Sequence, residues 1–200
     1  KTKKRVIFTS TCSVYGAQHE LLSEKSSVNP LSLYASTKLQ AEEYVLANEG
    51  LVFRLGTLFG LGDNFSRIRL DLVVNVLTLK AVTQNRLTIF GGEQWRPLLS
   101  VSDTASYIVE AVSGKLTGIY NLKYENLTIS SIADKIKRIF PKVKIDRTEL
   151  PYEDLRNYQV DTTKAEKQFK HRPTVTIKEE VLKMQKLFLE RRLKDFDDDI

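Results

Sequence analysis

Two residues with complementary acid–base chemistry stand four positions apart in the segment LYASTKLQAEEYVLAN. Tyr34 and Lys38 share one face of the helix that this segment predicts, because side chains at i and i+4 are neighbours on a helix. An ammonium group close to a phenol favours the phenolate and lowers a pKa that is otherwise about 10. The pair can therefore supply a general base near neutral pH. The same spacing is common on solvent-exposed helix faces, so the pair alone does not establish catalysis.

A run of small polar side chains follows the first apolar segment. The sequence RVIF leads directly into Ser10, Thr11, Cys12 and Ser13, and then into a Tyr-Gly pair. Consecutive hydroxyl and thiol side chains are an unusual way for a strand to leave a hydrophobic core, so we expect a ligand to bind here. The alternative is that Thr11 only caps a turn at the end of the strand.

Strands and helices alternate along the chain and must position both groups. A strand is predicted at residues 5–9 and a helix at 33–48, with a loop over 17–29 between them. Further strands are predicted within segments 51–60, 87–90, 96–103, 118–122 and 142–146. Further helices are predicted at 70–81, from a cap at Asp103 through 112, and at 128–140, 161–169 and 177–193. This alternation predicts an α/β protein with parallel strands at its centre.

Composition and charge limit the classes of partner. The chain of 200 residues carries a net charge of +6, but its basic clusters are short, separated by acidic residues and without interleaved aromatic side chains. We therefore expect no nucleic-acid partner, and the positive charge serves either solvation or a small anion such as a diphosphate. No apolar run has the length of a membrane span and no signal peptide is recognisable, so we expect a cytoplasmic protein without membrane contact.

Neither a metal site nor a dinucleotide-binding turn is predicted. Cys12 is the single cysteine, and His19 and His171 are the two histidines, which excludes an internal disulfide and disfavours zinc. The segment GTLFGLGDNF has the wrong glycine spacing for a G-x-G-x-x-G turn and no acidic residue at the required distance. We interpret it as a loop.

Four segments together resemble one family. TSTCSVYG, NPLSLYASTK, VFRLGTLFG and IFGGEQWRPLLSVSD, in this order, resemble the extended short-chain dehydrogenase/reductase family, specifically its NAD-dependent nucleotide-sugar epimerase/dehydratase group. The resemblance spans nearly the whole chain. It implies an α/β fold with a Rossmann-like, doubly wound parallel sheet and a small α/β substrate-binding region. Residues 1–60 would belong to the Rossmann-like catalytic domain and 61–200 mainly to the substrate-binding region, with elements at about 85–112 returning to the sheet.

The resemblance implies catalytic roles at matching positions. Tyr34 and Lys38 match the family's Tyr-x-x-x-Lys pair, in which the tyrosine removes the proton of a sugar hydroxyl. The lysine holds the nicotinamide ribose and lowers the tyrosine pKa. Thr11 matches the Ser/Thr that hydrogen-bonds the same hydroxyl, with Ser10 as an alternative. Ser10, Tyr34 and Lys38 are the expected contacts to NAD, and NADP is an open alternative.

The two residues after Thr11 distinguish between reactions. In the family's sugar 4,6-dehydratases these positions are Asp and Glu, which supply acid and base for the elimination of water, whereas here they are Cys12 and Ser13. The resemblance therefore implies hydride transfer without elimination, as in a 4-epimerase, or a one-way oxidation or reduction by a dehydrogenase or reductase. Cys12 and Ser13 are expected to contact the substrate, and Ser13 is a further alternative to Thr11.

Arginines are the expected contacts to the diphosphate of a nucleotide-diphosphate sugar. Arg96 matches an arginine that family members use in this way, and Arg156 matches a second one or is an ordinary surface residue. A guanidinium can bind phosphate oxygens in pairs. Arg67 and Arg69 are further candidates in the substrate loop. Asn75 either contacts the sugar nucleotide or serves helix packing.

The start of the sequence differs from the family pattern. Family members open with the Gly-rich nucleotide-binding unit, whereas this sequence starts one strand before the Ser/Thr position. We therefore expect a fragment that lacks the N-terminal half of the sheet, is inactive alone, and uses a homodimer contact or a partner chain to cover the exposed sheet edge. The rival hypothesis is a non-catalytic sugar-nucleotide-binding or interaction module, or one chain of a split enzyme.

Overall fold

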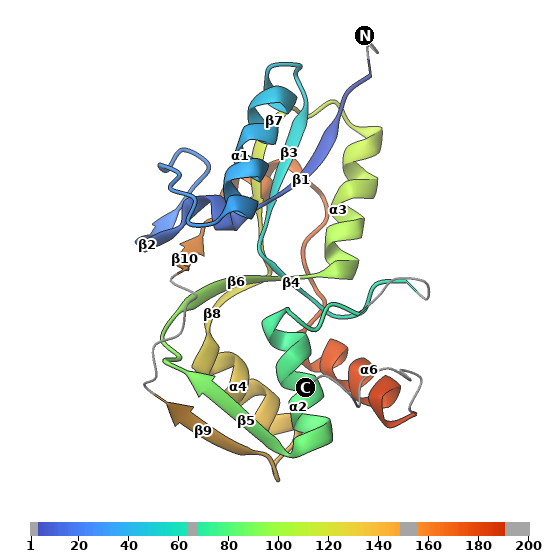
Figure 1. Cartoon of the computed structure of the whole chain (residues 1–200). Helices are drawn as coiled ribbons and strands as arrows, with labels where there is room; N and C mark the ends of the chain where they lie inside the picture. The colour runs from blue at the N-terminus through green and yellow to red at the C-terminus, as the bar shows by residue number, and fades with distance from the viewer. Residues whose placement is uncertain (1–3, 64–67, 149–155, 191–200) are drawn as a thin grey trace.

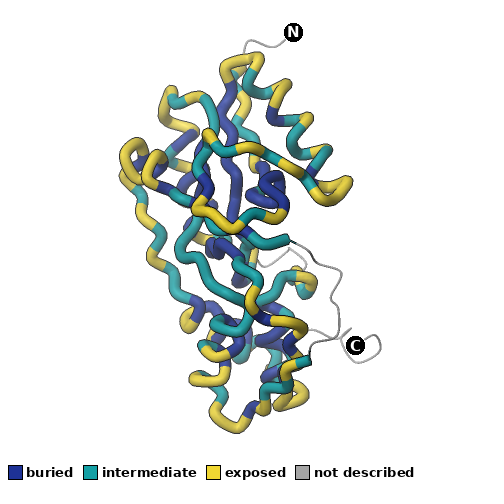
Figure 2. Tube along the Cα trace, turned by 90° about the vertical axis from the view of Figure 1, so that its left-hand side faces the viewer, coloured by how far each residue is buried: buried dark blue, intermediate teal, exposed yellow. Residues whose placement is uncertain are grey.

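The structure is a computed structural model that describes residues 4–63, 68–148 and 156–190. These residues form an elongated molecule of two stacked lobes, with a group of strands crossing between them (Figure 1). Buried segments, dark blue in Figure 2, run through the middle of both lobes, while exposed segments lie at the ends and on the outer helices. Each lobe therefore has its own apolar interior.

A three-stranded parallel sheet forms the centre of the upper lobe, which we call the sheet lobe. Its strand order is β1 (Ile7–Thr11), β3 (Leu51–Leu55) and β7 (Gly118–Leu122). All residues of β3 are buried, as expected for the central strand of a covered parallel sheet. Two helices, α1 (Leu33–Leu46) and α3 (Val101–Ser113), flank the sheet (Figure 1). This arrangement confirms the predicted α/β class with parallel strands.

Three smaller sheets complete the strands of the described residues. They are β2 (Ala17–Leu22) with β10 (Asn157–Val160), β5 (Arg86–Phe90) with β9 (Lys144–Thr148), and β4 (Thr57–Phe59) with β6 (Trp95–Ser100) and β8 (Glu125–Thr128). Neighbouring strands are parallel except β6 and β8, which are antiparallel. The sheet of β4, β6 and β8 crosses between the two lobes (Figure 1).

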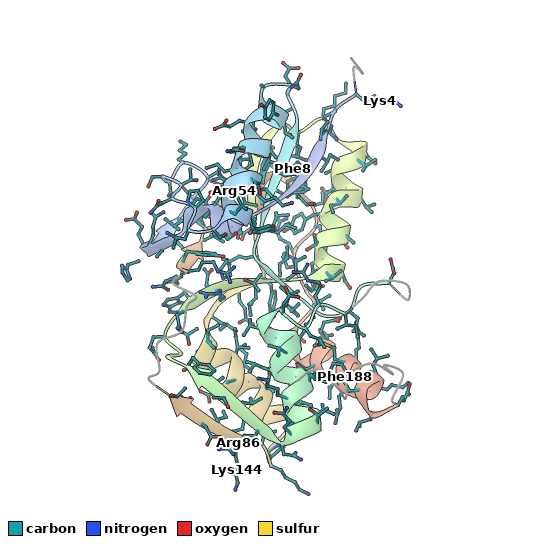
Figure 3. All side chains as sticks on the ribbon, in the orientation of Figure 1. Lys4, Phe8, Arg54, Arg86, Lys144 and Phe188 are labelled. Atoms are coloured by element: carbon teal, nitrogen blue, oxygen red, sulfur yellow. The ribbon has the colours of Figure 1, made fainter. Side chains whose placement is uncertain are left out.

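Three helices form the lower lobe together with β5 and β9, and we call it the helical lobe. The helices are α2 (Val73–Gln84), α4 (Ile129–Ile139) and α6 (Ile177–Leu189), and they pack on one another. Their shared core includes Leu77, Ile132, Ile136, Val181 and Met184. Phe188, labelled in Figure 3, packs at the edge of this core. The short helix α5 (Thr163–Gln168) packs instead against β7.

The prediction of a loop over residues 17–29 is wrong for its first part, where β2 lies. The sequence AQHELL has no apolar alternation, and Leu22 is its one buried residue. The strand forms because β10, far away in the sequence, pairs with it in parallel and because Leu22 packs in a core with Tyr158 and Val160. A pairing that depends on a distant segment leaves little local signal.

The predicted helix cap at Asp103 is wrong by three residues. Ser100 caps α3, and its Oγ accepts a hydrogen bond from the backbone N–H of Asp103 at 2.9 Å. Asp103 is buried, and its carboxylate accepts hydrogen bonds from the Ser100 hydroxyl and from the backbone N–H groups of Thr174 and Val175. The His171 ring lies 3.0 Å from the same carboxylate. Asp103 therefore ties the segment before α6 to α3.

The segment 85–112, expected to return to the Rossmann-like sheet, divides between the lobes. Tyr107 and Ala111 of α3 pack with Phe53 of β3 in the core of the sheet lobe. Among the described residues, β5 and β6 pair with strands of the smaller sheets and not with β1, β3 or β7. The helix of this segment thus lies on the sheet, while its strands pair elsewhere. None of the described helices is long and apolar enough to cross a membrane.

Candidate active site

A cavity of about 790 Å³ is lined by residues of both lobes. Its volume lies in the range of small-molecule sites. Six of the residues that the sequence predicts as catalytic or ligand-binding line this cavity. Three carry hydroxyl groups and three carry guanidinium groups: Ser10, Thr11, Tyr34, Arg69, Arg96 and Arg156. The ends of β1 and β3 open into this cavity, which is where ligands of open α/β sheets bind. The cavity therefore combines groups for proton transfer with groups for anion binding.

Thr11 ends β1 and caps the short 3-10 helix η1 (Cys12–Tyr15). Its Oγ1 accepts a hydrogen bond from the Ser13 N–H at 3.1 Å and lies 2.8 Å from the Ser13 hydroxyl oxygen. Turn capping, the alternative considered from the sequence, is therefore present. It does not remove Thr11 from the cavity, and a hydroxyl has two acceptor positions besides its donor. Thr11 can cap the turn and still bond a ligand.

Helix α1 brings Tyr34 and Lys38 to the end of β1. Ser32 caps the helix two residues before Tyr34. The Tyr34 residue is 55% exposed. The Lys38 Nζ donates a hydrogen bond to the Thr9 carbonyl at 2.8 Å and lies 4.7 Å from the centre of the Phe8 ring. The same nitrogen is 5.9 Å from the centre of the Tyr34 ring. The pair thus stands beside the strand that carries Thr11.

A buried ion pair lies behind this site. Glu42 of α1 receives three hydrogen bonds from Arg54 of β3, from Nε at 3.2 and 3.1 Å and from Nη2 at 2.7 Å. The Ser10 hydroxyl donates to the same carboxylate. All three side chains are buried. Figure 3 shows Arg54 where α1 lies against the sheet.

The ion pair extends to η1 and β7 through Tyr15. The Tyr15 hydroxyl accepts a hydrogen bond from Arg54 at 3.0 Å and donates to Asn121 at 2.8 Å. Burial raises the pKa of Tyr15 to about 12, so the phenol stays neutral. Burial disfavours the Arg54 charge, but hydrogen bonds to Glu42 and the nearby Tyr15 outweigh it and hold the pKa of the guanidinium above its ordinary value.

Cys12 and Ser13 are buried and are not among the described residues that line the cavity. The Cys12 thiol lies 3.2 Å from the Arg54 carbonyl oxygen. Burial raises the pKa of the thiol far above its ordinary range, so it remains protonated. The predicted substrate contacts of these two residues are therefore not brought to the cavity.

Three of the arginines predicted to bind diphosphate, Arg69, Arg96 and Arg156, line the same cavity. Arg96 is buried, and its Nη1 donates a hydrogen bond to the Arg156 carbonyl. Arg69 binds Asp71 through two hydrogen bonds at 2.7 and 2.6 Å, which raise the pKa of the guanidinium. Arg67 lies outside the described residues. The contacts of Arg69 and Arg96 hold both side chains at the cavity wall.

Asn75 is fully buried in α2 and is not among the described residues that line the cavity. Its Oδ1 accepts the Gly60 N–H at 2.9 Å, and its Nδ2 donates to the carbonyls of Gly60 and Arg69 at 3.2 and 3.1 Å. Glu180 of α6 accepts the neighbouring Leu61 N–H at 3.1 Å. Gly60 has a φ of 95°, and a Cβ there would collide with the Glu180 carboxylate. Asn75 and Glu180 therefore hold the backbone at Gly60, Leu61 and Arg69.

Two residues of the site were not identified from the sequence. Glu42 follows Lys38 by four positions on the same helix, and Arg54 interrupts the apolar strand LVFRL. A charged residue in the centre of a buried strand requires a partner of opposite charge. That interruption was the available signal, but the identity of the partner depends on how the helix lies on the sheet.

The sequence of this chain is similar to those of known proteins. Residues 1–122 match the family model "NAD dependent epimerase/dehydratase family". The protein named uncharacterized UDP-glucose epimerase YtcB, from Bacillus subtilis (strain 168), is 35% identical over 116 residues, which are 54% of this chain and 35% of that protein. UDP-glucuronic acid decarboxylase 1 of Arabidopsis thaliana is 25% identical over 205 residues, covering 96% of this chain and 47% of that protein. The chain thus spans less than half the length of these relatives.

A solved structure shows the same fold. TunA, described as an NAD dependent-NDP-hexosamine 5,6-dehydratase, aligns with a TM-score of 0.81 and 24% identity. The alignment covers 96% of this chain and 65% of TunA. The parallel sheet, its flanking helices and the strands between the lobes therefore have the arrangement found in TunA. The chain belongs to the NAD dependent epimerase/dehydratase family.

Proposed function

We propose that this chain supplies the sugar-binding side of the active site of an NAD-dependent epimerase that acts on a nucleotide-diphosphate sugar. The observation that carries the proposal is that one cavity is lined by Thr11 and Tyr34 together with Arg69, Arg96 and Arg156. A sugar hydroxyl needs a base and a hydrogen-bonding partner, and a diphosphate needs cationic groups. The name of the Bacillus subtilis relative, uncharacterized UDP-glucose epimerase YtcB, supports a substrate of this class.

Tyr34 is the proposed base that removes the proton of the sugar hydroxyl. Thr11, which also lines the cavity, hydrogen-bonds the same hydroxyl. Lys38 stands one helical turn after Tyr34, with its Nζ 5.9 Å from the centre of the Tyr34 ring. Arg96 and Arg156 bind the diphosphate and orient the sugar toward Tyr34.

The residues beside β1 fit the nicotinamide end of NAD. An ammonium has three N–H donors, and within the described residues Lys38 has one hydrogen bond, to the Thr9 carbonyl, so it can also donate to ribose hydroxyls. Lys38, Tyr34 and Ser10 are the proposed contacts. Bound NAD supplies the acceptor for a hydride from the sugar carbon. NADP remains the alternative, because the residues that would read the adenosine ribose are not recognisable in this sequence.

Oxidation and reduction without elimination fit this cavity better than dehydration. Elimination of water needs an acid and a base beside the sugar. Cys12 is buried and protonated, and Ser13 bonds Thr11. Asp71 is the one carboxylate among the described lining residues, and it is bound to Arg69. A 4-epimerase, or a dehydrogenase or reductase of the same substrate, is therefore proposed in preference to a dehydratase.

The test is turnover of nucleotide sugars by the protein as its gene encodes it, with NAD present. UDP-, dTDP- and GDP-hexoses are incubated, and the products are separated by anion-exchange chromatography. Tyr34→Phe should lower kcat by about 100-fold or more while calorimetric affinity for the nucleotide sugar is kept. Tyr44→Phe, an exposed tyrosine on the same helix, is the matched control and should leave kcat unchanged. Unchanged turnover of Tyr34→Phe would refute the assignment of the base.

The open edge of β1 favours a second candidate function, that of an interaction module. Among the described residues β1 pairs with β3 alone, and an unpaired strand edge can add another strand. The chain would then act as one part of an assembly, or as a sugar-nucleotide-binding module, with a second copy or another chain on this edge. Native mass spectrometry distinguishes these cases: a stable monomer that turns over substrate contradicts the assembly, and a stoichiometric complex supports it.

A further inference from the structure

The helix that carries Tyr34 and Lys38 has little apolar packing. Only Ala35 and Glu42 of α1 are buried, and Leu39 is partly buried at the edge of a small core. Leu33 and Tyr44 are exposed. Most helices are held on a sheet by an apolar stripe, which fixes their position through many contacts. In α1 a charged residue takes the central place of that stripe.

The Glu42 carboxylate reaches both strands under the helix. Arg54 and Ser10, which donate to it, are directly opposite each other in the pairing of β3 with β1. The side-on contact of a carboxylate with Nε and Nη2 of an arginine is directional, because the guanidinium is planar and rigid. A shift of α1 along the sheet would break these bonds and leave two charges buried without partners. Such a shift is strongly disfavoured.

The same contacts lie next to the reacting groups. Ser10 is adjacent to Thr11 in β1, and Tyr34, Lys38 and Glu42 follow one another at intervals of four along one side of α1. Eight residues of helix span about 12 Å, so Glu42 acts on Tyr34 through the rigid helix and not by contact.

We propose that the buried Glu42–Arg54 pair is a positioning device that fixes Tyr34 relative to Thr11 by holding α1 at one place on β1 and β3. The inference rests on the proposed function for its kinetic consequence. Glu42 and Arg54 are positioning residues, because neither is among the described residues that line the cavity. Their contribution is expected in kcat and not in the affinity for the nucleotide sugar.

Glu42→Asp is the sharpest perturbation, because it keeps the charge and shortens the side chain by one methylene. The helix must then move toward Arg54 or lose part of the contact. A misplacement of about 1 Å can reduce turnover by about 100-fold. We expect kcat to fall by about 30- to 100-fold, with the KM for the nucleotide sugar changed by less than about threefold.

Two further variants separate positioning from general stability. Asp103→Asn removes another buried carboxylate that lies away from α1, so it should lower the unfolding midpoint and leave kcat unchanged. The double variant Glu42→Leu/Arg54→Leu replaces the ion pair by apolar groups, which often preserves stability. The unfolding midpoint of the double variant should be close to that of the parent protein, while its kcat should stay as low as that of Glu42→Asp. Parallel recovery of both quantities would show that the pair only stabilises the fold.

A crystal structure of Glu42→Asp gives a readout that does not need turnover. We expect the Tyr34 hydroxyl to be displaced from Thr11 Oγ1 relative to the parent protein. If the parent protein has no epimerase, dehydrogenase or reductase activity, the proposed function fails, and this displacement alone decides the inference. An unmoved α1, or an unchanged kcat in Glu42→Asp, would overturn it.

Discussion

Replacement of Asn75 by alanine tests whether this residue holds a loop or contacts a ligand. The side chain makes three hydrogen bonds to backbone groups, two buried ones to Gly60 and a partly buried one to Arg69. Each is worth about 1 kcal/mol net, and more where the backbone group left behind stays buried. We therefore expect Asn75→Ala to lower the free energy of unfolding by about 3 kcal/mol.

Asn75→Asp sharpens the test because it is nearly isosteric. The carboxylate keeps an acceptor for the Gly60 N–H but directs its other oxygen at the carbonyls of Gly60 and Arg69. Repulsion between these oxygens should make this variant at least as unstable as Asn75→Ala. Gln84→Ala, at the exposed end of the same helix, is the control and should change stability by less than about 0.5 kcal/mol.

Urea unfolding followed by the fluorescence of Trp95, the single tryptophan, measures these changes. Circular dichroism checks that both probes report one transition. Calorimetric titration of UDP measures the anion site in the same variants. A stable Asn75→Ala protein that has lost its affinity for UDP would refute the role of Asn75 in holding the backbone and would support Asn75 as a ligand contact.

Three further predictions follow from the ionisable and capping groups. Burial raises the pKa of Tyr15 and Tyr107 to about 12, whereas an unfolded tyrosine ionises near about 10. Between these values the unfolded state binds fewer protons, so stability should fall as the pH rises, and ultraviolet titration should show two tyrosines that ionise late or only on unfolding. The buried, protonated Cys12 should react with a thiol reagent at the rate of unfolding, and fast labelling of the native protein would contradict its burial. Hydrogen bonds from Thr176 lower the pKa of Glu179 at the start of α6, so this contribution to stability is present at neutral pH and lost as the pH falls through the lowered value. Thr176→Ala should therefore lower the free energy of unfolding at neutral pH and lower it less in acid, as measured by urea unfolding.

Local signals were sufficient for the elements that carry the chemistry. The apolar strand before Ser10 and the helix that begins after Ser32 follow from patterns within a few residues, and both lie where predicted apart from shifts of a few residues at their ends. The sequence also places Thr11 and Tyr34 on elements that meet at the cavity. Such elements are predictable because capping and apolar spacing act over one or two turns.

Long-range pairings decided the rest. β2 depends on β10, and the carboxylate of Asp103 serves a segment some seventy residues later, so neither role is visible locally. The ion pair of Glu42 and Arg54 has the same origin. Arg54 within LVFRL indicates a buried charge, but many acidic residues could have been its partner. Glu42 is the partner because α1 lies on the sheet at this position. A buried ion pair between two elements that are distant in the sequence also fixes how these elements lie relative to each other, because a shift would leave both charges without a partner. The pair of Glu42 and Arg54, rather than an apolar contact, is therefore the feature that can set the geometry of Tyr34.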